Sequence, residues 1–142
     1  MADYTALISH ALAARERAYA PYSNFAVGAA LLCEGGAVFT GCNIENSAYS
    51  PTNCAERTAL FKAVSEGHRH FEAIAIVGGR FPGKVSELCP PCGVCRQVLL
   101  EFCDPARFEV VLARSPGDYE CHLLSDLIPH SFSKYSLKGW PR

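Results

Sequence analysis

The chain has 142 residues, of which 49% are hydrophobic and 19% are charged; this composition excludes long disorder, and we expect one domain over residues 1–142. The formal net charge is −1 and no run of Lys and Arg occurs, which excludes the basic stripe typical of proteins that bind nucleic acid duplexes. No stretch of about 18 apolar residues is present and the N-terminus has no basic region followed by an apolar core, so we expect neither a membrane span nor a secretory signal.

The first part of the chain predicts a helix followed by a β-hairpin. Residues 4–19 place apolar side chains at helical spacing, and Pro21 is expected to end this helix. Residues 25–33 are almost entirely apolar and predict a buried strand. The turn at residues 34–36 leads to a second strand over residues 37–44, so the two strands are expected to pair as a hairpin.

The middle of the chain predicts two helices separated by a strand. Residues 53–67 have helical periodicity, with Asn53 as the expected N-cap and Gly67 as the expected C-cap. Residues 71–79 predict a third strand, and a loop then leads to a helix over residues 92–102. This helix begins within the sequence CPPCGVC, which packs three cysteines into seven positions.

The last part of the chain predicts a second hairpin and a short helix. Residues 107–114 and 119–124 predict strands, and the SPGD turn between them is too short for the crossover that a parallel pair needs. A short helix is expected near residues 124–128. Strands that alternate with helices predict an α/β fold whose sheet is covered on both faces.

Three cysteines are expected at the N-termini of two helices. Cys54 follows the expected cap of one helix, and Cys92 and Cys95 lie in the first turn of the next. A helix N-terminus carries partial positive charge, which lowers the pKa of a cysteine and favours thiolate. Three thiolates that converge at one point form a site for zinc, and a fourth position left for water is typical of catalytic zinc.

The CPPCGVC sequence also allows three other interpretations. Cys89 as a fourth ligand would give a closed structural zinc site. Cys92 and Cys95 alone would suit a thioredoxin-like redox pair, which leaves Cys54 unexplained. An iron–sulfur cluster would need a further cysteine where Leu99 stands.

Glu56 lies two residues after Cys54, where its carboxylate can reach a water at the metal. Cys-Ala-Glu followed 36 residues later by Pro-Cys-Gly-Val-Cys matches the zinc deaminase signature, with cysteine in place of the usual histidine. The segments NIENSAYSPTNCAERTALFKAVSEG and PCGVCRQVLLEF resemble the short zinc-dependent cytidine deaminases, and the resemblance covers about residues 21–132. The family usually has serine at the position of Pro90.

The resemblance implies a three-layer α/β/α cytidine deaminase-like fold with a five-stranded mixed sheet. It implies one Zn²⁺ per chain, held by Cys54, Cys92 and Cys95. It also implies hydrolytic deamination of cytidine and deoxycytidine to uridine and deoxyuridine in pyrimidine salvage. In that reaction a zinc-bound hydroxide attacks C4 and Glu56 acts as the proton shuttle.

The resemblance also implies roles in substrate binding. Phe25 would lie against the pyrimidine ring, and the backbone of Ala55 would contact the base edge. Asn43 and Glu45 would form hydrogen bonds with the ribose hydroxyls. Taken alone, Asn43 and Glu45 also suit a turn, and Phe25 also suits a core position at the start of a strand.

Three further residues complete the set that the resemblance implies. Arg57 would donate hydrogen bonds to the thiolate ligands, and Tyr49 and Phe132 would reach the site of a neighbouring subunit in a homotetramer. The C-terminal sequence SKYSLKGWPR departs from the family, and we assign no role to its Trp140.

The substrate and the cellular location are separate questions. A polynucleotide deaminase needs a basic channel, which this composition does not supply, so we expect a small nucleoside substrate. A deaminase of a cytosine-containing antibiotic such as blasticidin S would not be expected to keep Asn43 and Glu45, and a zinc-stabilised interaction module would not need Glu56. The remaining cysteines are expected to be reduced, which favours a cytoplasmic location, and four are expected in the core: Cys33, Cys42, Cys103 and Cys121.

Overall fold

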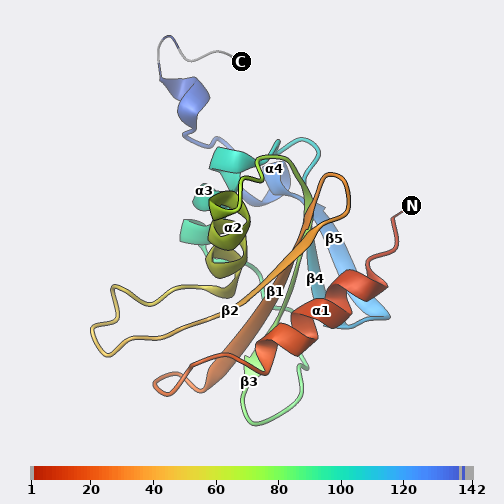
Figure 1. Cartoon of the computed structure of the whole chain (residues 1–142), viewed down its shortest axis with the longest axis vertical. Helices are drawn as coiled ribbons and strands as arrows, with labels where there is room; N and C mark the ends of the chain where they lie inside the picture. Colours follow the sequence, from red (N-terminus) through yellow and green to blue (C-terminus); the bar gives the residue numbers. More distant parts are fainter. Residues whose placement is uncertain (1, 138, 140–142) are drawn as a thin grey trace.

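The computed structural model describes residues 2–137 and 139, so Trp140 lies outside the described residues. Helices and strands alternate along most of the chain, as predicted (Figure 1). In chain order the elements are α1 (Thr5–Arg15), β1 (Phe25–Cys33), β2 (Val38–Cys42), α2 (Ala55–Ser65), β3 (Phe71–Arg80), α3 (Gly93–Phe102), β4 (Glu109–Ser115), β5 (Asp118–Leu123), α4 (Leu124–Leu127) and a 3₁₀ turn (Lys134–Ser136).

The five strands form one mixed sheet in the order β2-β1-β3-β4-β5. Strands β3 and β4 are parallel, and every other neighbouring pair is antiparallel, which confirms both predicted hairpins. Helix α1 lies on one side of the sheet, and α2 and α3 lie on the other (Figure 1). The predicted three-layer α/β/α arrangement is therefore confirmed.

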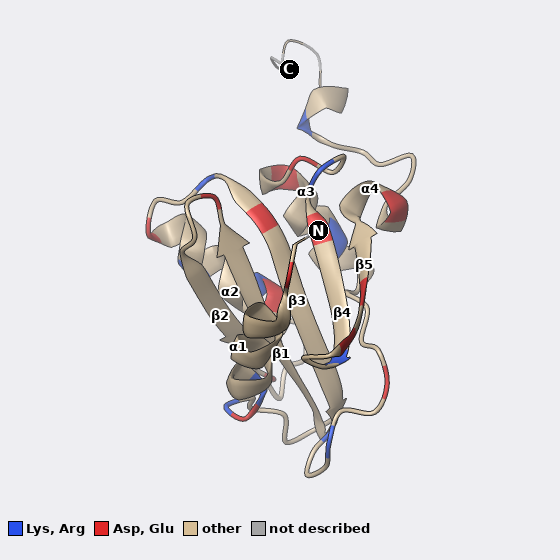
Figure 2. Cartoon of the chain, turned by 90° about the vertical axis from the view of Figure 1, so that its right-hand side faces the viewer, with Lys and Arg blue, Asp and Glu red and all other residues tan. Residues whose placement is uncertain are grey.

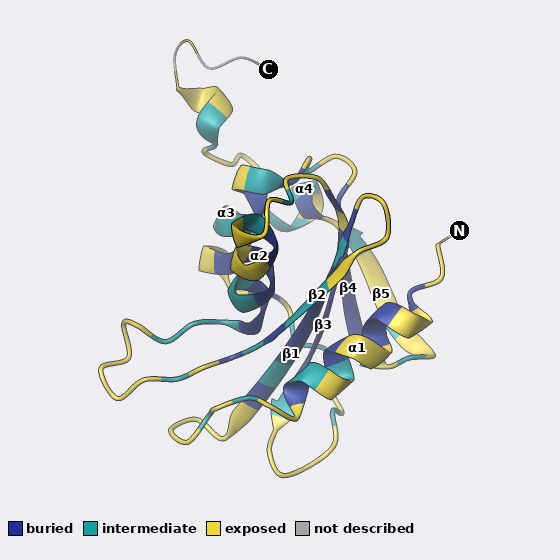
Figure 3. Cartoon of the chain, in the orientation of Figure 1, coloured by how far each residue is buried: buried dark blue, intermediate teal, exposed yellow. Residues whose placement is uncertain are grey.

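Side chains alternate between the two faces of the central strands, and each face has its own core. Ala30, Ala75 and Val111 face α1, whereas their neighbours Ala29, Ile74 and Val110 face α2 and α3. Buried residues are concentrated in β1, β3 and β4, and the edge strands are more exposed (Figure 3).

Two glycines let a helix lie directly on the sheet. A Cβ atom at Gly28 would lie 2.0 Å from the backbone oxygen of Ala11 in α1. A Cβ atom at Gly41, on the other face, would lie 2.5 Å from the backbone oxygen of Ala55 in α2. Real Cβ contacts are never this short, so both close approaches require glycine.

Helix α1 is shorter than the sequence predicts. It ends at Arg15 instead of residue 19, because the backbone of Tyr19 pairs with the segment after β2. Its N–H donates to the oxygen of Asn43 over 3.0 Å, and its own oxygen accepts from the N–H of Glu45 over 2.8 Å. The chain therefore leaves the helix before it reaches Pro21.

Two other predictions about local structure were wrong. Cys54, not Asn53, is the N-cap of α2, and the amide of Asn53 donates to the hydroxyl of Thr58 over 3.1 Å instead. Cys33 and Cys103 are buried as predicted, but Cys42 is only partly buried and Cys121 is exposed, because both lie in edge strands.

Candidate active site

The topology brings the N-termini of α2 and α3 to one end of the sheet. Strands β2 and β3 both run antiparallel to β1, so they point in the same direction. Helix α2 follows β2 and α3 follows β3, so both helices begin at the same edge. Cys54 is the N-cap of α2 and Cys92 is the N-cap of α3, with Cys95 in the first turn.

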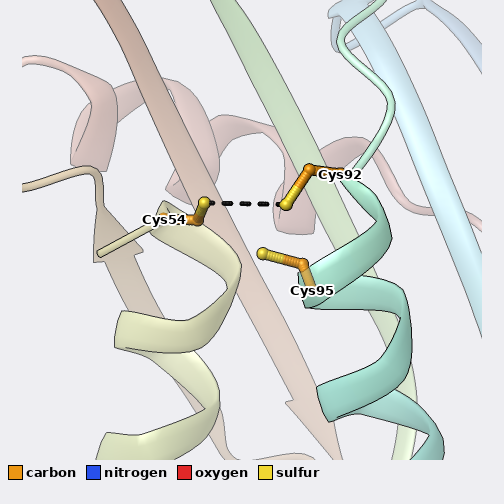
Figure 4. Close-up of side chains that lie close together, drawn as sticks. All are labelled: Cys54, Cys92 and Cys95. Atoms are coloured by element: carbon orange, nitrogen blue, oxygen red, sulfur yellow. Dashed lines mark hydrogen bonds between the residues drawn. The ribbon is translucent and has the colours of Figure 1, made fainter. Parts of the chain in front are cut away.

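The predicted convergence of these three thiols is confirmed. Their sulfur atoms all lie within 4.8 Å of one another and point toward a common centre between the two helices (Figure 4). The sulfurs of Cys54 and Cys92 are 3.9 Å apart. Tetrahedral zinc with Zn–S bonds of about 2.3 Å holds its sulfur ligands roughly 3.8 Å apart. The donor set therefore fits a zinc ion.

Cys89 is not part of this thiol cluster. Within the described part of the chain, Cys54, Cys92 and Cys95 form the one group of three or more side chains spaced to hold a metal. Cys89 packs instead over the backbone of Gly78, where a Cβ would lie 2.7 Å from its sulfur. Burial raises the pKa of the Cys89 thiol to about 11, which disfavours a thiolate ligand.

The thiols of Cys54 and Cys95 share a hydrogen bond that shifts both of their pKa values. A hydrogen bond from the Cys95 thiol and the neighbouring Arg57 guanidinium together lower the pKa of Cys54 to about 5, against the opposing effect of burial. The same hydrogen bond raises the pKa of Cys95, because its proton is shared with the Cys54 thiolate. Of these two thiols Cys54 thus ionises first, and zinc binding would displace the proton held by Cys95.

Arg57 lies beside the Cys54 thiol. Its Nη2 donates to the sulfur of Cys54 over 3.3 Å. Its Nε is buried, and within the described residues it has no hydrogen-bond partner. The guanidinium therefore faces the thiol cluster as a source of positive charge.

Glu56 is a buried carboxyl group beside the thiols. It is only 5% exposed, and burial raises its pKa to about 7, with the negative charge of Cys54 acting in the same direction. Its carboxyl also interacts with the Cys95 thiol. A carboxyl with a pKa near neutrality can both accept and donate a proton at physiological pH.

Asn43 supports the first residues of β1. Its side-chain oxygen accepts from the N–H of Val27 over 2.9 Å, and its side-chain nitrogen donates to the oxygen of Phe25 over 2.8 Å. Phe25 is 39% exposed, so its ring is not the core side chain that its position at the start of a strand suggests.

Glu45 accepts hydrogen bonds from Tyr22 and Ser23, two residues that no sequence pattern singles out. Its carboxylate accepts from the N–H groups of Tyr22 and Ser23 over 2.9 and 3.1 Å, and from the Ser23 hydroxyl. Glu45 lines a cavity of about 390 Å³ together with Tyr22, Ser23, Tyr49 and Thr52. The hydrogen bonds to Glu45 join residues that are 22 and 23 positions apart, so local sequence patterns do not predict them.

Of the other predicted site residues, Ala55 is buried, whereas Tyr49 and Phe132 are exposed. Ala55 is fully buried at the first position of α2. Tyr49 and Phe132 are 72% and 65% exposed, so both rings project from the chain. Gln97 of α3 donates a hydrogen bond to the backbone oxygen of Phe132 over 2.9 Å.

Comparison with known proteins finds similarity over most of the chain. The family model described as the cytidine and deoxycytidylate deaminase zinc-binding region matches residues 1–111. A cytidine deaminase from Sporosarcina psychrophila is 54% identical over 135 residues, which cover 95% of each chain. The crystal structure of cytidine deaminase from Burkholderia pseudomallei aligns with a TM-score of 0.82 at 51% identity, covering 93% of this chain and 100% of that one. The structure from Mycobacterium tuberculosis aligns with a TM-score of 0.77 at 40% identity, covering 93% and 98%.

Proposed function

Since this chain belongs to the family of zinc-binding cytidine and deoxycytidylate deaminases, we propose that it converts cytidine and deoxycytidine to uridine and deoxyuridine by hydrolysis, as a step of pyrimidine salvage. The chain is a hydrolytic deaminase with a cluster suitable for one zinc ion. The observation that carries the proposal is the buried Glu56 carboxyl beside three converging thiols.

The residues around the zinc site set the charge on the metal and its ligands. When bound by Cys54, Cys92 and Cys95, zinc supplies Lewis acidity and lowers the pKa of a water molecule toward about 7. Three thiolates carry more negative charge than zinc carries positive charge, which weakens this effect. Arg57 and the N-termini of α2 and α3 place compensating positive charge around the sulfurs.

Glu56 handles the protons of the reaction. Its carboxylate accepts a proton from the nucleophilic water as that oxygen bonds to C4 of the pyrimidine, and it delivers the proton to N3. A second proton passes through Glu56 to the amino group, which leaves as ammonia as the C4 carbonyl forms. Water and cytidine thus give uridine and ammonia, and a carboxyl with a pKa of about 7 suits both directions of transfer.

Substrate binding is proposed for the surface beside the thiols. The exposed ring of Phe25 would lie against the base, and the backbone of Ala55 would contact the base edge. The Glu45 carboxylate would accept hydrogen bonds from the ribose hydroxyls, and the Asn43 amide would donate a hydrogen bond to them. Glu45 is already fixed by Tyr22 and Ser23, so its carboxylate would not need to be ordered on binding.

A free nucleoside is a better substrate than a polynucleotide. Lys and Arg positions are scattered along the ribbon and interspersed with Asp and Glu positions (Figure 2), and the formal net charge is −1, so the sequence lacks the run of basic residues that a polynucleotide channel needs. The exposed rings of Tyr49 and Phe132 support the proposal of a homotetramer in which each ring reaches a neighbouring site.

All eight cysteines are free thiols, which supports the proposed cytoplasmic location. None of the helices among the described residues has the length and apolar character to cross a membrane.

Ultraviolet absorbance tests this proposal directly. Zinc-loaded chain is mixed with cytidine, and loss of the cytidine band is followed for the wild type and for Glu56→Gln. We expect turnover by the wild type and a loss of at least about 10²–10⁴-fold in the variant, with zinc content unchanged. A folded wild-type chain with one zinc and no turnover would contradict cytidine as the substrate, and modified cytosines would be tried next.

A further inference from the structure

Arg15 is a buried cation at the same end of the sheet as the zinc thiols, but on the opposite face. It is the last residue of α1 and is only 4% exposed. No other Lys or Arg among the described residues is buried to this extent. None of the ion pairs in the described part of the chain includes it.

The guanidinium of Arg15 forms four hydrogen bonds, all to backbone oxygens. Nε donates to Ala26 over 3.0 Å and Nη1 donates to Gly83 over 3.1 Å. Nη2 donates to Gly79 over 3.1 Å and to Arg80 over 2.9 Å. These oxygens belong to the start of β1, the end of β3 and the loop that follows β3. The Arg15 side chain therefore connects these three segments through hydrogen bonds.

The strand segment that Arg15 holds is the one that carries Phe25. Arg15 binds the oxygen of Ala26, and Asn43 binds the residues on either side of Ala26, at the oxygen of Phe25 and the N–H of Val27. The first three residues of β1 are thus fixed by two side chains that come from different parts of the chain.

The loop after β3 is attached to the same place. The N–H of Phe81 donates to the oxygen of Asn24, which directly precedes Phe25, over 2.8 Å. The ring of Phe81 also lies 5.4 Å from the guanidinium carbon of Arg15, within cation–π range. Gly28 sets the depth of Arg15, because a Cβ there would lie 2.6 Å from the backbone nitrogen of Arg15.

We propose that Arg15 is a positioning residue for nucleoside binding, which holds the start of β1 so that the ring of Phe25 presents its face to the base. This inference rests on the proposed function. Within the described part of the chain, the hydrogen bonds and the ring contact of Arg15 involve neither the thiols nor Glu56, so its effect is expected on substrate affinity and not on the chemical step. A lysine could not replace it, because an ammonium group has three donors at one point and the four oxygens are spread over three segments.

The test compares Arg15→Lys with Ile8→Val. Ile8 is fully buried in the same helix and faces the same core, so its loss of a methyl group destabilises α1 without removing a hydrogen bond. For Arg15→Lys we expect KM for cytidine to rise about tenfold, with kcat within about twofold of the wild type and one zinc per chain. For Ile8→Val, at a similar loss of Tm, KM should stay at the wild-type value.

The outcomes separate this proposal from the proposed function. An unchanged KM in Arg15→Lys, or an equal rise in Ile8→Val, would overturn the positioning role while leaving the deaminase assignment intact. Absence of turnover by the wild type would instead overturn the assignment. If Arg15→Lys does not fold, Phe81→Leu decides, because it removes only the ring on the guanidinium: a KM rise of a few-fold at constant kcat supports the role, and no change overturns it.

Discussion

Two buried charged residues lie at one end of the sheet, on its two faces, and their surroundings differ. Arg15 is surrounded by backbone oxygens that cannot ionise, and four of its donors are satisfied. Glu56 lies among thiols that can ionise, and its own pKa is raised to about 7. The fixed backbone dipoles around Arg15 satisfy its charge, so Arg15 holds the surrounding backbone in place. Glu56 lies among ionisable partners, so its carboxyl group can exchange protons.

The two faces share one means of placing these residues. Helix α1 reaches the sheet at Gly28 and α2 reaches it at Gly41, so each buried charge is carried by a helix pressed directly on a strand. The division between the faces leads to four predictions: changes on the α2 and α3 face should affect metal binding and chemistry, and changes on the α1 face should affect substrate affinity.

Cys54→Ser should have the largest effect. Serine is a far weaker zinc ligand than thiolate, so we expect zinc content to fall from one per chain to a small fraction and deamination to fall by at least about 10³-fold. Zinc is measured with a chromogenic chelator and turnover by absorbance. Cys121→Ser, at an exposed site in β5, is the control and should change neither. Full zinc content in Cys54→Ser would refute the assignment of this ligand.

Arg57→Lys should weaken the metal site without removing a ligand. Lysine keeps the charge but loses the hydrogen bond from Nη2 to the Cys54 sulfur. Loss of a group that supports a ligand typically lowers metal affinity by about 10–100-fold, and we expect a change of this size in competition with a chelator. Arg107→Lys, at an exposed position on the loop before β4, is the matched control. Equal affinities in the two variants would show that Arg57 does not support the ligand.

The two glycines allow a direct test of the division between faces. An added methyl group would meet backbone atoms at either site, so we expect Gly28→Ala and Gly41→Ala each to lower the free energy of unfolding by at least about 1–3 kcal/mol in urea titrations. Gly41→Ala should also lower zinc affinity, because it displaces the turn of α2 that carries Cys54. Gly28→Ala should keep its zinc and raise KM, because it displaces Arg15.

Gly117→Ala is the control for this pair. Gly117 lies in the turn between β4 and β5, and an added Cβ there has no atom within 4 Å. Stability, zinc affinity and KM should all stay at wild-type values. If Gly28→Ala lost zinc as readily as Gly41→Ala, the two faces would not act separately.

The sequence predicts the thiol cluster well for a physical reason. Each of Cys54, Cys92 and Cys95 stands at a helix start that follows a strand, and both features are visible in local patterns of the chain. The zinc deaminase spacing adds Glu56 to the same place. The two hairpins could also be predicted, because turn length limits how two consecutive strands can pair.

The supporting contacts could not be predicted, because they join distant parts of the chain. The hydrogen bond from Arg15 to Gly83 spans 68 positions, and those from Tyr22 and Ser23 to Glu45 span 23 and 22. The early end of α1 has the same origin, since Tyr19 leaves the helix to pair with residues 43–45. Local periodicity carries no information about such partners. The hydrogen bonds that distinguish Arg15 from other polar residues are therefore visible only in the folded structure.

The smallest expected effect is that of Cys89→Ala, at the first cysteine of CPPCGVC. The Cys89 sulfur lies over Gly78, outside the three-thiol cluster, and its raised pKa disfavours a thiolate. Zinc content should therefore stay at one per chain, while loss of the partly buried sulfur lowers the free energy of unfolding by about 1 kcal/mol. Zinc analysis and urea titration of the same sample measure both. Loss of zinc in Cys89→Ala would mean that Cys89 closes the metal site as a fourth ligand, which would leave no position for the water on which hydrolysis depends.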